Sequence, residues 1–137
     1  MKLEEKIMNV IGGMHVGAVA TIAGDLPAVR FMALSGYDDM ILVAGTMKGT
    51  RKVKEIHACP DAAISIWSGN DFSDPYVGIH AKAEVHEDRD TKEHYWNPMF
   101  EEFFKSVENP DFVVLVFTAE TIEYYMPPDM EPEIWKR

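Results

Sequence analysis

The chain has 137 residues, a length typical of one domain with its own hydrophobic core. Its net charge of −10 argues against general nucleic-acid binding, which needs a basic surface to neutralise phosphates. The single cysteine, Cys59, excludes an intramolecular disulfide, no apolar run is long enough to span a membrane, and the N-terminus lacks the apolar stretch of a signal peptide. We therefore expect one domain over residues 1–137, located in the cytoplasm, with neither a membrane nor nucleic acid as partner.

The first half of the chain is predicted to form a short helix and then an antiparallel meander. Apolar spacing indicates a helix over residues 3–11 that ends at Gly12 and Gly13. Gly24 and Asp25 have the composition of a tight turn between two strands. The strands of this meander are expected at residues 16–23, 27–35 and 40–45, with a second turn over residues 36–39.

The second half begins with a short helix, about residues 51–58, which Cys59 and Pro60 end because the residue before proline is disfavoured in helical geometry. Residues 76–87 alternate between apolar and polar side chains, as a half-buried strand does. Residues 89–106 are predicted to be helical, with a second segment starting at Pro98 and one apolar face. That face comprises Tyr95, Trp96, Met99, Phe100, Phe103 and Phe104; further strands are expected at residues 62–68, 112–119 and 121–126, followed by an extended tail.

This pattern of about six or seven strands joined mostly by short turns predicts a mainly β protein. A parallel sheet would need a crossover helix between each pair of strands, and the chain has too few helices for that. We therefore predict an antiparallel β-barrel with a few short helices.

The stretch "GTMKGTRK", residues 45–52, gathers positive charge in an otherwise acidic chain. Gly49 would allow a tight turn, and Thr50 would cap a helix that starts at Arg51. A helix N-terminus binds anions through its free N–H groups, and arginine binds phosphate through two hydrogen bonds. Arg51 and Lys52 in the first turn therefore indicate either a phosphate site or a solvated basic turn. This is not a Walker A loop, because its glycines are four residues apart and Gly-Lys-Ser/Thr is absent.

Arg30 strengthens the case for a phosphate. It lies in an otherwise apolar strand, on the same face as Met32 and Leu34. An arginine among apolar neighbours needs a partner, which is either a carboxylate or an anionic ligand.

These segments together resemble the pyridoxamine 5'-phosphate oxidase-like FMN-binding split barrels. The resemblance is carried by "VATIAGDLPAVRFMAL" (19–34), "LVAGTMKGTRKVKEI" (42–56) and "CPDAAISIW" (59–67). The later segments "YWNPMFEEFF", "NPDFVVLVF" and "IEYY" are similar to the general stress protein branch of that family, so the resemblance covers nearly the whole chain. It implies a split β-barrel of six or seven strands that forms a homodimer with FMN at the subunit interface.

The resemblance also implies roles for individual residues. Arg30 and Met32 would line the phosphate and ribityl region. Thr50, Arg51 and Lys52 would hold the phosphate. Two further residues, Gly45 and Thr46, would lie near the isoalloxazine edge, and Tyr76 would contact the FMN of the facing subunit.

The sequence departs from the family at one position that matters. Pyridoxamine phosphate oxidases carry a substrate-contacting lysine five residues after the strand arginine, and here that position is Ser35. The C-terminal tail also lacks their substrate-binding arginine motif, so oxidation of vitamin B6 is not expected.

The expected function is that of a flavin oxidoreductase with an unidentified small-molecule substrate or electron acceptor. No residue is marked out as a catalytic acid or base, and the five histidines show no metal-binding spacing. A protein that only holds FMN, for storage, sensing or electron transfer, remains an alternative. So does a split barrel that binds a deazaflavin or haem.

Overall fold

A computed structural model describes all residues from Met1 to Arg137. Seven strands form a single antiparallel sheet in the order β3-β2-β1-β4-β5-β6-β7. Pairing of β3 with β6 closes the first six strands into a barrel, and β7 adds to the free part of β6. The strands are β1 (Gly13–Ala23), β2 (Leu26–Tyr37), β3 (Ile41–Met47), β4 (Asp61–Trp67), β5 (Tyr76–His86), β6 (Phe112–Tyr125) and β7 (Glu133–Lys136). The predicted mainly β, antiparallel split barrel is thus confirmed.

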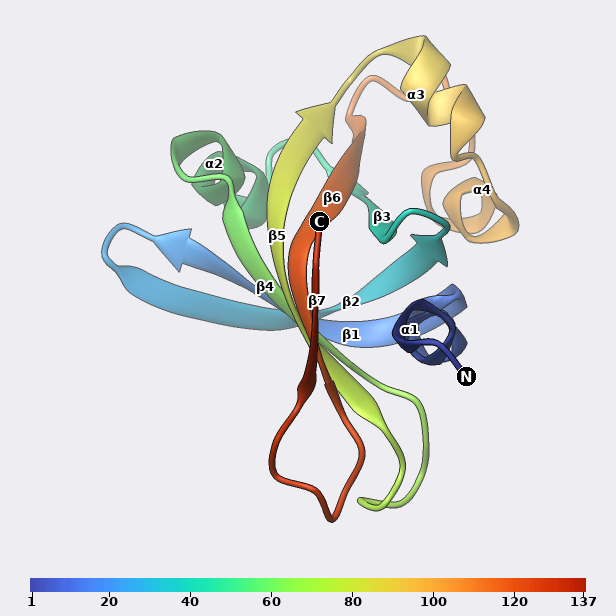
Figure 1. Ribbon diagram of the computed structural model, residues 1–137. Coiled ribbons are helices and arrows are strands. Elements are labelled where there is room, and N and C mark those ends of the chain that lie inside the picture. Colours follow the sequence, from blue (N-terminus) through green and yellow to red (C-terminus); the bar gives the residue numbers. More distant parts are fainter.

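Four short helices lie around this barrel, and Figure 1 shows their places. Apolar side chains of α1 are fully buried in the main core, which lies inside the barrel. α2 packs against β1 and β5, while α3 and α4 form an excursion between β5 and β6. None of the helices has both the length and the apolar character needed to cross a bilayer. Their bounds are α1 (Leu3–Ile11), α2 (Arg51–Ala58), α3 (Arg89–His94) and α4 (Pro98–Phe104).

The local predictions agree closely with these elements. Residue-by-residue pairing of β1 with β2 leaves Gly24 and Asp25 as a two-residue turn, in which Gly24 has a φ of 70°. Along β5, Val77, Ile79 and Ala81 are buried, as the alternation predicted. Since successive side chains of a strand point to opposite faces, the polar residues between them lie on the outer face.

Two predictions in the second half were wrong. Residues 112–119 and 121–126 form one continuous strand, β6, because Glu120 is accommodated as a bulge. Thr121 pairs with His80 and Ala119 with Ala81, which leaves Glu120 without a partner on β5. The expected apolar face over residues 89–106 also excludes Phe103, whose side chain is 67% exposed.

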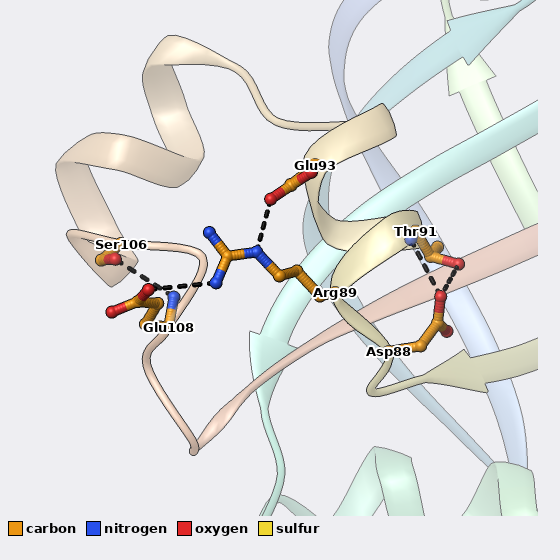
Figure 2. Close-up of polar contacts among 6 residues, drawn as sticks. All are labelled: Asp88, Arg89, Thr91, Glu93, Ser106 and Glu108. Atoms are coloured by element: carbon orange, nitrogen blue, oxygen red, sulfur yellow. Dashed lines mark hydrogen bonds and ion pairs between the residues drawn. The ribbon is translucent and has the colours of Figure 1, made fainter.

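The α3–α4 excursion is held in place by polar contacts that Figure 2 shows. Asp88 caps α3 by accepting hydrogen bonds from the N–H and the hydroxyl of Thr91, and these bonds lower the pKa of Asp88 to about 2. Arg89 binds Glu93 within α3 and Glu108 in the loop after α4. These contacts are exposed and contribute little, whereas Phe100 and Phe104 of α4 pack against Phe112 of β6 and over Gly45 of β3.

The barrel has an open seam between β2 and β3. These strands pair only at Ser35 with Val43, Gly36 with Leu42, and Tyr37 with Ile41. Beyond these three pairs the remainder of β2 pairs only with β1, and the remainder of β3 pairs only with β6. The two strands therefore diverge and present backbone groups along the seam that no ladder uses.

Candidate functional site

Arg30 is the centre of a polar network at one end of the seam. Its Nη2 lies 3.0 Å from the carboxylate of Glu55, which belongs to α2. Its Nη1 donates to the hydroxyl of Thr21 at 2.8 Å and to the carbonyl of Val19 at 3.2 Å, and that hydroxyl donates to Glu55 at 2.6 Å. From the sequence, the partner of Arg30 could be either a carboxylate or an anionic ligand. The structure supplies a carboxylate, from a residue that the sequence did not single out.

Glu55 does not use all the donors of Arg30. A guanidinium has five N–H donors, and the three contacts above account for three of them. The Nε–H and one N–H of Nη2 remain, and they lie along one edge of the guanidinium plane. Two donors along one edge are the arrangement with which arginine binds phosphate. Arg30 can therefore keep Glu55 and still bind an anion.

The N-terminus of α2 lies in the same region, and it differs in detail from the prediction. Thr50 occupies the N-cap position, but its hydroxyl donates to the carbonyl of Met47 at 2.9 Å instead of capping the helix. The predicted capping bond was wrong because Thr50 closes the preceding turn. Gly49 does not adopt a positive φ, so that turn does not require glycine. The first turn contains no acidic residue, and its N–H groups stay available to an anion.

The charges of α2 and β2 influence one another directly. Burial, and then the positive charge of Arg30, lower the pKa of Lys52. The hydroxyl of Thr21, followed by Arg30 and Arg51, holds the pKa of Glu55 below its usual value. Arg30, Arg51 and Lys52 thus surround Glu55, and the four side chains carry a net formal charge of +2. We call these four residues the cation cluster.

The other two lysines of the basic segment do not join the cation cluster. Lys48 pairs with Glu87 at 2.7 Å, and both side chains are more than half exposed. Lys54 lies on an exposed position of α2. The charge run therefore divides into two residues of the cation cluster and two surface lysines.

Three predicted site residues lie along the seam. Met32 is 8% exposed and belongs to the core inside the barrel, and Thr46 is also buried. A Cβ on Gly45 would lie 2.7 Å from a ring atom of Phe104 and 2.8 Å from one of Phe100. Gly45 is thus needed for the close packing of α4 on β3, which is a role that the sequence did not suggest.

A pocket of about 530 Å³ opens beside these residues, between β2, β3 and α4. Met32 and Gly45 line it, together with Phe31, Met47 and Phe103. The sequence predicted Phe103 on the apolar helix face and gave no role to Phe31. The signal for Phe31 was present, because it alternates with Arg30 and Met32 and therefore faces outward from β2. We call this hollow the α4 pocket.

Tyr76 lies elsewhere. It is the first residue of β5, which begins at the opposite end of the sheet from α2 (Figure 1). Its ring stacks on that of Tyr125, with the ring centroids 4.8 Å apart. Within one chain, Tyr76 does not meet the cation cluster.

The outer face of β1 and β2 is apolar and exposed. Val16 is 70% exposed on β1, and on β2 Val29 is 69% and Phe31 79% exposed. Large apolar side chains that gather on adjacent strands indicate an interaction surface, whereas isolated ones need no explanation. We call these three residues the β1–β2 face.

Comparisons with a family model, a curated protein and solved structures all match the same family. The family model described as pyridoxamine 5'-phosphate oxidase matches residues 3–126. General stress protein 26 of Bacillus subtilis is 27% identical over 121 residues, which cover 88% of this chain and 86% of that protein. The crystal structure of General Stress Protein 26 from Bacillus anthracis is 26% identical and has a TM-score of 0.84, with each chain covered completely.

Two more distant structures share the fold alone. One is described as an F420 reductase, with 18% identity and a TM-score of 0.67 over 84% of this chain and 94% of that one. The other is a heme binding protein from Mycobacterium smegmatis, with 14% identity and a TM-score of 0.81. The match covers 99% of this chain and 58% of the heme binding protein.

Proposed function

The chain belongs to the pyridoxamine 5'-phosphate oxidase family, and on that premise we propose that it is an FMN-binding oxidoreductase of the cytoplasm. Proteins that share this fold include an F420 reductase and a heme binding protein, so the fold by itself does not select the cofactor. The observation that carries the choice of FMN is the cation cluster at the end of the open seam, formed by Arg30 of β2 with Arg51 and Lys52 of α2.

The cation cluster fits a terminal phosphate in charge and in donors. A phosphate monoester carries a charge of about −1.5 to −2 at neutral pH, which matches the net +2 of the cluster. Arg30 offers two donors along one edge, α2 offers the N–H groups of its first turn, and Thr50 lies at the start of that helix. An anion would also relieve the mutual repulsion of Lys52 and Arg30.

The seam suits the remainder of the cofactor. Met32, Gly45 and Thr46 follow the cation cluster along β2 and β3, where unpaired backbone groups can hydrogen-bond the polar edge of a ring. Bound FMN would supply hydride or electron transfer, while the chain supplies binding, orientation and exclusion of water. No side chain at the seam is assigned as an acid or a base.

A homodimer completes the proposal. The β1–β2 face would be covered by a second copy of the chain, since exposed side chains of this size gain by leaving water. Tyr76, which is remote from the cation cluster of its own chain, would then contact the FMN of the partner.

Other uses of the fold are less well supported. Pyridoxamine phosphate as substrate is disfavoured because Ser35 replaces the family's lysine and the α4 pocket has no charged side chain. The second candidate function, a protein that holds FMN without turnover, would use the same cation cluster. It is separated from an oxidoreductase by turnover with a reduced nicotinamide and an electron acceptor.

Purified protein tests the cofactor. We expect a flavin absorbance spectrum and, in the Arg51→Ala/Lys52→Ala double variant, about 10- to 100-fold weaker binding of FMN, because hydrogen bonds from charged groups are lost. The matched control is Lys48→Ala/Lys54→Ala, which removes the same charge from the same segment but lies outside the cation cluster. Equal losses in both double variants would refute the phosphate site, and a haem spectrum would refute FMN.

A further inference from the structure

The α4 pocket carries an inference about the substrate, which rests on the proposed flavin site beside it. We propose that this pocket binds a small, uncharged, aromatic molecule, and that this is the substrate class of the protein. The pocket adjoins the seam at Met32 and Gly45, so a molecule in it would lie next to a cofactor held along β2 and β3.

The lining of the α4 pocket excludes charged ligands. Eight of its nine lining residues are apolar, and the ninth is Gly45, which has no side chain. A carboxylate or phosphate there would lose its water without gaining a partner, which is strongly unfavourable. Arg30 is the neighbour of Phe31 on β2, but its side chain points to the opposite face of the strand. There it binds Glu55 and would bind the proposed phosphate. The net charge of −10 adds a general penalty for anions.

The shapes of the lining side chains favour an aromatic ligand. Phe31 and Phe103 present largely exposed rings at the rim, and Phe100 lies deeper, where it is 3% exposed. Aromatic rings gain from offset or edge-to-face contacts with another ring. Met47 and Met99 add thioether groups, which contact ring edges favourably and adapt to different shapes. A volume of about 530 Å³ lies within the usual range for pockets that bind small molecules.

A second pocket of similar size is a less suitable candidate for this ligand. It lies between the β4–β5 loop and the segment after β6, and is lined in part by Phe72, Tyr76 and Met130. Asp129 also lines it, and nothing connects it to the seam within one chain. It serves as the internal control for the test.

The test uses three probes with the same ring and different charge, namely 2-naphthol, 2-naphthoate and 2-naphthyl phosphate. Calorimetric titration of the full chain saturated with FMN, which occupies the cation cluster, is expected to show 2-naphthol binding at least about tenfold more tightly than either anion. Phe103→Lys should weaken 2-naphthol about tenfold and reduce or reverse the preference over the anions. Met130→Lys, a substitution at a similarly exposed residue of the other pocket, should change neither the affinity for 2-naphthol nor the preference over the anions.

Two results would overturn the inference. One is binding of 2-naphthyl phosphate to the FMN-saturated wild type as tight as that of 2-naphthol. The other is a loss of 2-naphthol binding in Met130→Lys but not in Phe103→Lys, which would place the ligand in the other pocket. FMN content is measured separately from flavin absorbance. If the protein takes up no FMN but still binds 2-naphthol preferentially in the α4 pocket, the proposed function is refuted. The inference that the α4 pocket binds uncharged aromatic molecules then still stands.

Discussion

The guanidinium of Arg30 lies 3.0 Å from the carboxylate of Glu55, and this ion pair joins β2 to α2. The two side chains are 22% and 13% exposed, so the pair is partly shielded from water. It orients Arg30 while leaving two of its donors free. It also places the one negative charge of the cation cluster where it opposes an incoming phosphate.

Replacing that carboxylate should therefore tighten binding of FMN. Glu55→Gln keeps an oxygen that can accept from Thr21 and Arg30 but removes the negative charge. We expect about three- to tenfold tighter binding, measured by quenching of flavin fluorescence on titration. Weaker binding in the variant would mean that Glu55 serves chiefly to position Arg30.

The same substitution should alter stability in acid. The pKa of Glu55 in the folded protein lies below its ordinary value of 4.5, so ionised Glu55 stabilises the fold at higher pH. That contribution is present above about pH 4.5 and is lost as the pH falls through the lower, folded-state pKa. Urea unfolding should thus show wild type losing more stability than Glu55→Gln on acidification. Parallel pH profiles would contradict this assignment.

Lys52 should make anion binding sensitive to alkaline pH. The pKa of Lys52 lies below the ordinary lysine value of 10.5 because the side chain is partly buried and near Arg30, so it loses its charge at lower pH than a surface lysine. We expect the affinity for FMN to fall as the pH rises toward the lowered pKa of Lys52. Lys52→Arg should hold its affinity to higher pH, since arginine stays protonated. Titration of the flavin itself affects both proteins equally, so the difference between their pH profiles reports Lys52 alone.

Two glycines of the basic stretch 45–52, Gly45 and Gly49, should respond differently to alanine. At Gly45 a Cβ would approach rings of Phe104 and Phe100 to within 2.7 and 2.8 Å, and such overpacking costs about 1–3 kcal/mol. At Gly49 a Cβ would meet nothing within 4 Å. Gly49→Ala should therefore leave the free energy of unfolding within about 0.5 kcal/mol of wild type. Denaturant titration of both variants measures the difference, and equal stabilities would contradict the packing of α4 on β3.

The β1–β2 face can be tested without touching either pocket. Val16 is 70% exposed and lines neither the α4 pocket nor the seam. Val16→Lys should weaken the proposed homodimer at least about tenfold, because a desolvated and unpaired ammonium would enter the interface. Analytical ultracentrifugation measures the change, with Ile134→Lys on β7 as a control at another exposed apolar residue. A wild-type chain that is monomeric at micromolar concentration would refute the shared site.

Many local features could be predicted from the sequence because their causes lie close together in the chain. The bounds of α1 and α2, the turn at Gly24 and the buried face of β5 follow from side-chain periodicity, a proline and a glycine. The continuity of β6 could not be predicted in this way. A polar residue between two apolar runs resembles a strand end, and only pairing with β5 makes Glu120 a bulge.

The candidate site also has features that could be predicted from the sequence and features that depend on the fold. The sequence by itself determined that positive charge gathers near Arg51 and that Arg30 needs a partner, because composition and strand alternation are local properties. Only the tertiary structure decided that Glu55 is that partner, that Lys48 binds Glu87, and that Tyr76 lies at the far end of the barrel. Closure of β3 on β6 also created the open seam and placed α4 over Gly45. These relations join residues distant in the chain, and their geometry exists only when the whole sheet has closed.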